Sequence, residues 1–126
     1  MMRTTWMMLA LAATLAVLWS SGTSFSADPK YTIKEVMKLA HVGKPPLCGK
    51  VVQGKATEAE KKQLLELYQA LAANKPPRGD LKDWEERTKA LVEAAKALVA
   101  NDKDAIAKYK QALNCAACHK EHKPAS

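Results

Sequence analysis

The stretch DKDAIAKYKQALNCAACH, residues 102–119, carries the pattern that decides the fold class of this chain. Ile106, Tyr109 and Leu113 recur at helical spacing, which predicts one continuous helix that begins at the start of this stretch. The helix is then expected to continue into the sequence Cys-Ala-Ala-Cys-His at residues 115–119. The C-terminal part of the chain is therefore predicted to be a helix that carries two thiols and an imidazole.

Cys115, Cys118 and His119 occupy positions i, i+3 and i+4, which lie on one side of a helix. This is the spacing of a c-type haem attachment motif, in which two thiols add to the vinyl groups of a haem and the histidine binds its iron. We predict one covalent haem c, with Cys115 and Cys118 as its thioether residues and His119 as the proximal iron ligand. A zinc site that also uses His122 is the alternative, but ligands so close together on one rigid turn rarely surround an ion.

The N-terminus has the pattern of a secretory signal peptide. Arg3 lies in a short charged start, an apolar run covers residues 7–19, and small and polar residues follow over 20–27. We expect residues 1–27 to be cleaved and the domain to comprise residues 28–126. The apolar run is short for a membrane span, and the cleavage region has no cysteine for a lipid anchor. A periplasmic or otherwise exported protein without stable membrane insertion is predicted.

Charge and size limit the partners and the core. Removal of 27 residues from 126 leaves 99, and loss of Arg3 lowers the formal net charge from +7 to +6. So short a chain has a marginal core, and a covalent haem would add apolar area to it. We expect redox partner proteins, acidic ones in particular, because a basic surface attracts them. The lysines are interspersed with glutamates along the helices, so no nucleic-acid partner is predicted.

Capping residues divide the rest of the chain into helices joined by Pro/Gly linkers. Capping boxes of Thr32 with Glu35 and of Thr57 with Glu60 each open a helix, and Asp80 can cap another. The predicted helices are 32–41, 57–74, 80–101 and the C-terminal one, with a further turn or two over 47–53. No segment has a convincing strand pattern.

These elements predict an all-α fold, a four-helix up-down-up-down bundle with the covalent haem on the C-terminal helix. The expected core stripes are formed by Leu64, Leu67, Tyr68 and Leu71 on one helix and by Trp84, Thr88, Leu91, Ala95 and Leu98 on the next.

The sixth iron ligand must come from upstream of the motif or be absent, because only seven residues follow His119. Met37 lies in the apolar stripe of the first helix, and His41 lies one turn further on. His122 is one turn beyond the proximal ligand on the same side of the iron, so it cannot reach the opposite face. Met37, His41 and an open site remain as three alternatives.

Cys48 is the odd cysteine. It is expected to be a buried free thiol or to form an intermolecular disulfide, and a homodimer could also form through a flat helix face.

The mature chain resembles the cytochrome c prime family throughout, in its predicted bundle, its signal peptide and its C-terminal Cys115-Ala-Ala-Cys118-His119. The resemblance implies that His119 is the proximal ligand and that Cys115 and Cys118 carry the thioethers. Low-spin relatives have a methionine ligand on the first helix, which implies Met37. The chain departs from the family at His122 and Lys123, where an aromatic residue and an arginine are usual.

The function predicted from the sequence is that of an exported monohaem c-type cytochrome that carries one electron. The chain has no acid/base pair or nucleophile arrangement that would indicate an enzyme. The alternative is a five-coordinate haem protein that binds NO or CO as a trap or sensor. The third interpretation is a helical protein-interaction domain that is stabilised by a bound zinc ion.

Overall fold

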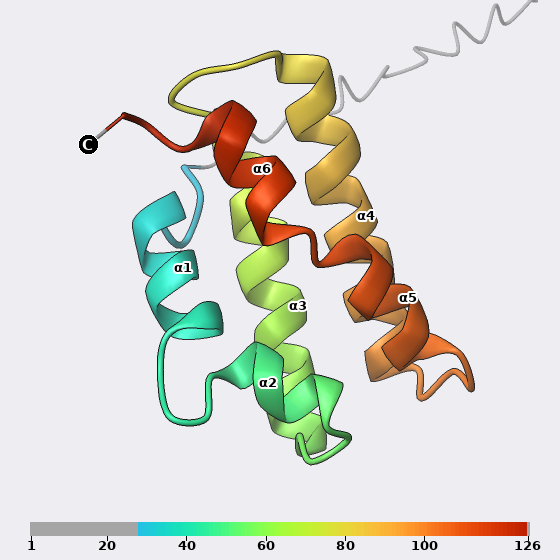
Figure 1. Ribbon diagram of the computed structural model, residues 1–126. Helices are drawn as coiled ribbons and strands as arrows, with labels where there is room; N and C mark the ends of the chain where they lie inside the picture. The colour runs from blue at the N-terminus through green and yellow to red at the C-terminus, as the bar shows by residue number, and fades with distance from the viewer. Residues whose placement is uncertain (1–27, 126) are drawn as a thin grey trace, which may run out of the picture.

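The computed structural model describes residues 28–125, and the predicted signal peptide therefore lies outside the described residues. The described part is all-helical, without a strand, as the sequence predicted (Figure 1). Its helices are α1 (Ile33–His41), α2 (Leu47–Val52), α3 (Glu58–Ala73), α4 (Leu81–Val99), α5 (Ala105–Ala112) and α6 (Cys115–His122). Within residues 28–125 no helix has both the length and the apolar character needed to cross a membrane.

The predicted capping residues begin the helices as expected. In both capping boxes the threonine hydroxyl accepts a hydrogen bond from the backbone N–H of the glutamate, and the glutamate carboxylate accepts one from the threonine N–H. Asp80 accepts from the backbone N–H of Lys82 at 2.9 Å and caps α4. These bonds satisfy N–H groups that a helix leaves unpaired at its N-terminus.

The core lies where the helices meet. Successive long helices run in opposite directions: α1 and α4 run towards the lower end of the view, and α3, α5 and α6 run back (Figure 1). The main packed pairs are α3 with α4, α4 with α5, and α1 with α3, while α6 packs against the first half of α4. The predicted stripe of α3 is at most 2% exposed, and the α4 stripe is buried apart from half-buried Leu91.

The C-terminal helix is not continuous, contrary to the prediction. Leu113 (φ −80°, ψ 71°) and Asn114 (φ −107°, ψ 75°) leave the helical conformation, which separates α5 from α6. The Asn114 side chain accepts a hydrogen bond from the backbone N–H of Ala117 at 3.2 Å. Asparagine is a strong N-cap residue, so it starts a new helix at the cysteine motif instead of continuing the old one.

Candidate functional site

The cysteine motif forms the first turns of α6, with its reactive side chains on one side. Cys115 and His119 are exposed and Cys118 is half-buried, and both cysteines are free thiols. All three line the same groove. The expectation that these three residues share one face is therefore confirmed.

This groove is lined by residues of α1, α3, α4, α5 and α6. Its cavity volume is about 90 Å³. This volume is below the usual range of about 300–1,000 Å³ for ligand and cofactor sites. The lining residues other than the motif are Met37, His41, Leu71, Arg87, Thr88, Leu91, Ala112, Leu113 and Asn114.

The two upstream candidates for an iron ligand both reach this groove from α1. Met37 is half-buried, while its stripe neighbours Val36 and Ala40 are fully buried and hold α1 against the core. His41, at the end of α1, is also half-buried and faces the groove. The structure thus brings Met37 and His41 together with Cys115, Cys118 and His119, five residues that come from opposite ends of the domain.

His122 does not belong to the groove and has a structural role. Its ring is 2% exposed, its Nδ1 is 2.9 Å from the carbonyl oxygen of Arg78, and its Nε2 is 2.7 Å from Oδ2 of Asp83. The ring also packs edge-on against Trp84, with centroids 5.2 Å apart. Each ring nitrogen thus lies within hydrogen-bond distance of an acceptor oxygen. The imidazole is therefore engaged on both sides and is not placed as a zinc ligand.

Residues around the start of α4 complete this contact with α6. Arg78 donates to the carbonyl oxygens of Lys120 (2.7 Å) and Lys123, which lie at the C-terminal end of α6. Gly79 has φ +88°, and a Cβ there would be 2.6 Å from the carbonyl oxygen of Glu121. We call Arg78, Gly79, Asp83 and His122 the α6 anchor, because they hold the motif helix against α4.

Asp83 connects the α6 anchor to the groove. Its Oδ2 accepts a hydrogen bond from Nε of Arg87 at 2.7 Å as well as from His122. The bond from Arg87, followed by that from His122, holds the pKa of the Asp83 carboxyl below its usual value. Arg87 is the only lysine or arginine among the residues that line the groove.

Several residues of the site were missed by the sequence analysis. Arg78 and Arg87 are the only arginines after Arg3 in a chain whose other basic residues are lysines. That rarity was a usable signal, because a guanidinium can bond several acceptors in fixed directions and an ammonium cannot. Tyr68, whose hydroxyl is 3.4 Å from Nε2 of His41, had no comparable signal, since core tyrosines are common.

Cys48 is a free, half-buried thiol on α2. Burial raises the pKa of this thiol, so it is kept in its neutral form. Cys48 is thus a free thiol, as one of the two alternatives predicted, but it is half-buried and not fully buried.

The chemistry of the groove fits a covalently attached haem. Two free thiols and an exposed imidazole are on α6, apolar side chains line the walls, and a cationic side chain lies at one edge. His41, which also lines the groove, has a buried Nδ1 without a hydrogen-bond partner. Within residues 28–125 no cluster of three or more Cys, His, Asp or Glu side chains is arranged around a common point, as a zinc site requires.

Comparison of the chain with protein-family models, with curated proteins and with solved structures finds no match.

Proposed function

We propose that this protein is an exported monohaem c-type cytochrome that carries one electron between redox partners and is not an enzyme. The observation that supports this most is the shared groove, where the haem attachment motif on α6 faces the two ligand candidates on α1. Two residue sets far apart in the sequence thus line one groove.

Each side chain has a definite role in this proposal. Cys115 and Cys118 would hold the haem through thioether bonds, and His119 would bind the iron. The haem supplies a one-electron couple, which the protein tunes through its axial ligands and the surrounding polarity. The guanidinium of Arg87 is available to pair with a haem carboxylate, and the leucines of the groove exclude water.

The proposed cytochrome c prime resemblance requires four helices, whereas residues 28–125 form six. In that interpretation α5 and α6 together form the fourth helix of an up-down-up-down bundle, with a bend at Leu113 and Asn114. The bend allows Asn114 to cap the motif helix.

The direct test is the absorption spectrum of the purified mature protein, oxidised and reduced, with and without carbon monoxide. We expect a haem spectrum that changes reversibly with one electron per protein and does not respond to carbon monoxide. A ferrous spectrum that shifts with the gas would instead support the five-coordinate NO- or CO-binding protein. A protein without a haem band would refute both.

The distribution of charge supports an acidic redox partner. Residues 57–99, which include α3 and α4, hold eight acidic and eight basic side chains, whereas residues 28–56 hold six basic and two acidic ones. Residues 100–126 hold five basic and three acidic ones. The whole excess of positive charge therefore lies on the parts of the chain that contain α1, α2, α5 and α6. Of these, α1, α5 and α6 contribute directly to the groove.

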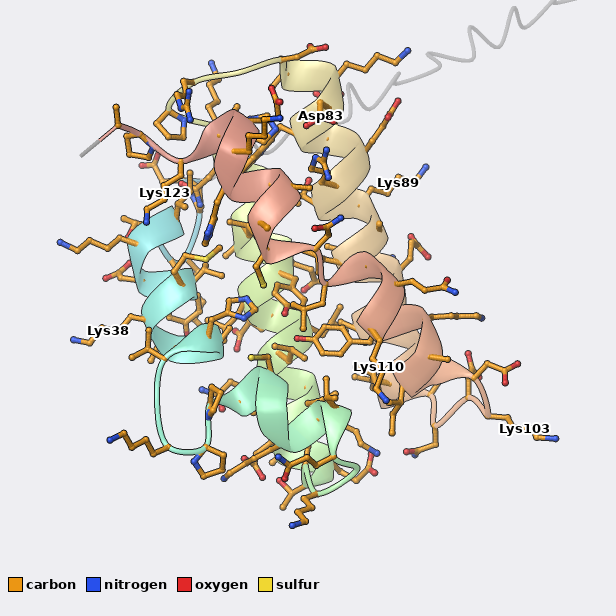
Figure 2. The ribbon with its side chains drawn as sticks, viewed as in Figure 1. Lys38, Asp83, Lys89, Lys103, Lys110 and Lys123 are labelled. Atoms are coloured by element: carbon orange, nitrogen blue, oxygen red, sulfur yellow. The ribbon has the colours of Figure 1, made fainter. Side chains whose placement is uncertain are left out.

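Most lysines of residues 28–56 and 100–126 form no ion pair with a carboxylate. In the part of the chain that the structure describes, Lys34, Lys38, Lys44, Lys108, Lys110, Lys120 and Lys123 form no ion pair. Lys38 extends from α1 on one side of the molecule, and Lys89 extends from α4 on the other (Figure 2). Lys38 and Lys120 are each adjacent in sequence to a residue of the groove.

Charge reversal near the groove should slow electron transfer to an anion. We expect the variant Lys38→Glu/Lys120→Glu to reduce hexacyanoferrate(III) several-fold more slowly than the parent at low salt, with the difference disappearing at high salt. The measurement is the second-order rate of one-electron oxidation of the reduced holoprotein. The control variant Lys82→Glu/Lys89→Glu has the same net charge as the first variant, but its substitutions lie on α4. Its electron transfer should be slowed less. Equal rates in the two variants would show that only net charge matters.

A further inference from the structure

One nitrogen of the half-buried His41 has an environment that no other buried side-chain nitrogen or oxygen of the described residues has. Among the buried side-chain nitrogen and oxygen atoms of residues 28–125, only His41 Nδ1 lacks a hydrogen-bond partner. An unpaired buried polar atom costs about 1–3 kcal/mol of stability, so native proteins have few of them. The cost is removed if that nitrogen bonds a group that is present in the functional protein.

The other side of the same ring is held by the protein. The Tyr68 hydroxyl is 3.4 Å from His41 Nε2, and the two rings are stacked with centroids 5.9 Å apart. Tyr68 in turn forms a 2.5 Å hydrogen bond with the hydroxyl of Tyr109, and both tyrosines are fully buried. A histidine that binds a metal through one nitrogen usually bonds a fixed partner through the other. The ring of His41 has this arrangement.

Met37, in contrast, has no unpaired polar atom that a bound group would satisfy. Its thioether requires no hydrogen bond, and its side chain already packs against the apolar core.

We propose that His41 is the sixth iron ligand, opposite His119, and that Tyr68 is the residue that positions it. This inference rests on the proposed haem attachment and deepens it. It replaces the methionine that the family resemblance implies with a second imidazole. Two imidazoles give a lower reduction potential than an imidazole and a thioether. A filled sixth position also closes the iron to small gases, which favours the carrier over the gas-binding protein.

The test compares His41→Ala with Met37→Leu as holoproteins, by electron paramagnetic resonance and absorption spectroscopy. We expect the ferric parent and Met37→Leu to be low-spin with the signals of two imidazoles. His41→Ala should be high-spin, should bind carbon monoxide when reduced, and should return to the low-spin state when imidazole is added. Circular dichroism of each variant verifies that the helices are intact.

Two outcomes would overturn the assignment. A low-spin His41→Ala together with a high-spin Met37→Leu would make Met37 the ligand. A parent that is high-spin and binds carbon monoxide would make the site open. In both cases the haem remains attached, so the failure is distinct from that of the proposed function, in which the parent has no haem band at all.

The positioning role of Tyr68 has its own readout. Tyr68→Phe removes the hydroxyl beside His41 Nε2 and should leave the iron low-spin while raising the reduction potential, because the imidazole becomes a weaker electron donor. Tyr109→Phe is the matched control, since it breaks the other end of the tyrosine pair and should shift the potential less. Equal potentials in Tyr68→Phe and the parent would limit Tyr68 to a packing role.

Discussion

The variant Cys115→Ser/Cys118→Ser is expected to lose its haem completely when the protein is denatured, whereas the parent keeps haem bound to the polypeptide. The reason is that, in the proposed cytochrome, only the two thioethers would join the haem covalently to the chain, and axial ligands dissociate on unfolding. The measurement is the haem absorbance that stays with the polypeptide on a denaturing gel or after extraction with acidic organic solvent. Each single serine variant should keep one thioether.

The same double variant should also unfold at a much lower temperature than the parent. A chain of this size has a marginal core, and the groove walls lose their apolar contacts when no haem is held between them. Cys48→Ser is the matched control, because it removes the remaining thiol outside the motif and should keep both the haem and the stability. Haem that stays covalently attached in the double variant would contradict the assignment of Cys115 and Cys118.

The second large effect is expected from His122→Ala, which should lower the free energy of unfolding by about 3 kcal/mol. The alanine removes two hydrogen bonds, one of them to a carboxylate, together with the packing on Trp84. A loss of this size lowers the melting temperature by about 12–24 °C in a domain of about 100 residues. Urea and thermal unfolding followed by circular dichroism measure both quantities.

Lys120→Ala is the control for His122→Ala, because Lys120 is exposed on the same helix and should change stability by no more than about 0.5 kcal/mol. Gly79→Ala tests the α6 anchor from its other side, since its Cβ would collide with the carbonyl oxygen of Glu121. Gly54→Ala has a similar positive φ (+71°) but open surroundings, so it measures the backbone cost alone. If His122→Ala were as stable as Lys120→Ala, the α6 anchor would not stabilise the fold.

Most helix boundaries could be predicted because they depend on neighbouring residues. A capping box needs two side chains three positions apart, and a core stripe needs apolar residues at helical spacing. The starts of α1, α3 and α4 and the buried faces of α3 and α4 were predicted on that basis. The break between α5 and α6 was missed, although Asn114 is itself a local N-cap signal, because the periodicity of the apolar residues was given more weight.

The sequence by itself determined that the chain is helical and that Cys115, Cys118 and His119 share one face of a helix. It also limited the upstream ligand candidates to Met37 and His41. These properties follow from the rise and rotation per residue of a single helix, which determine how residues a few positions apart are arranged.

Only the tertiary structure decided which distant groups meet. The packing of α1 and α6 against α3 and α4 places Met37 and His41 in the groove of the motif, brings Arg87 to its edge and sets Tyr68 beside His41. It also turns His122 away from the groove to bond Asp83, 39 residues earlier in the chain. Contacts over such separations depend on how whole helices pack, and no local sequence pattern encodes which pair of side chains will meet.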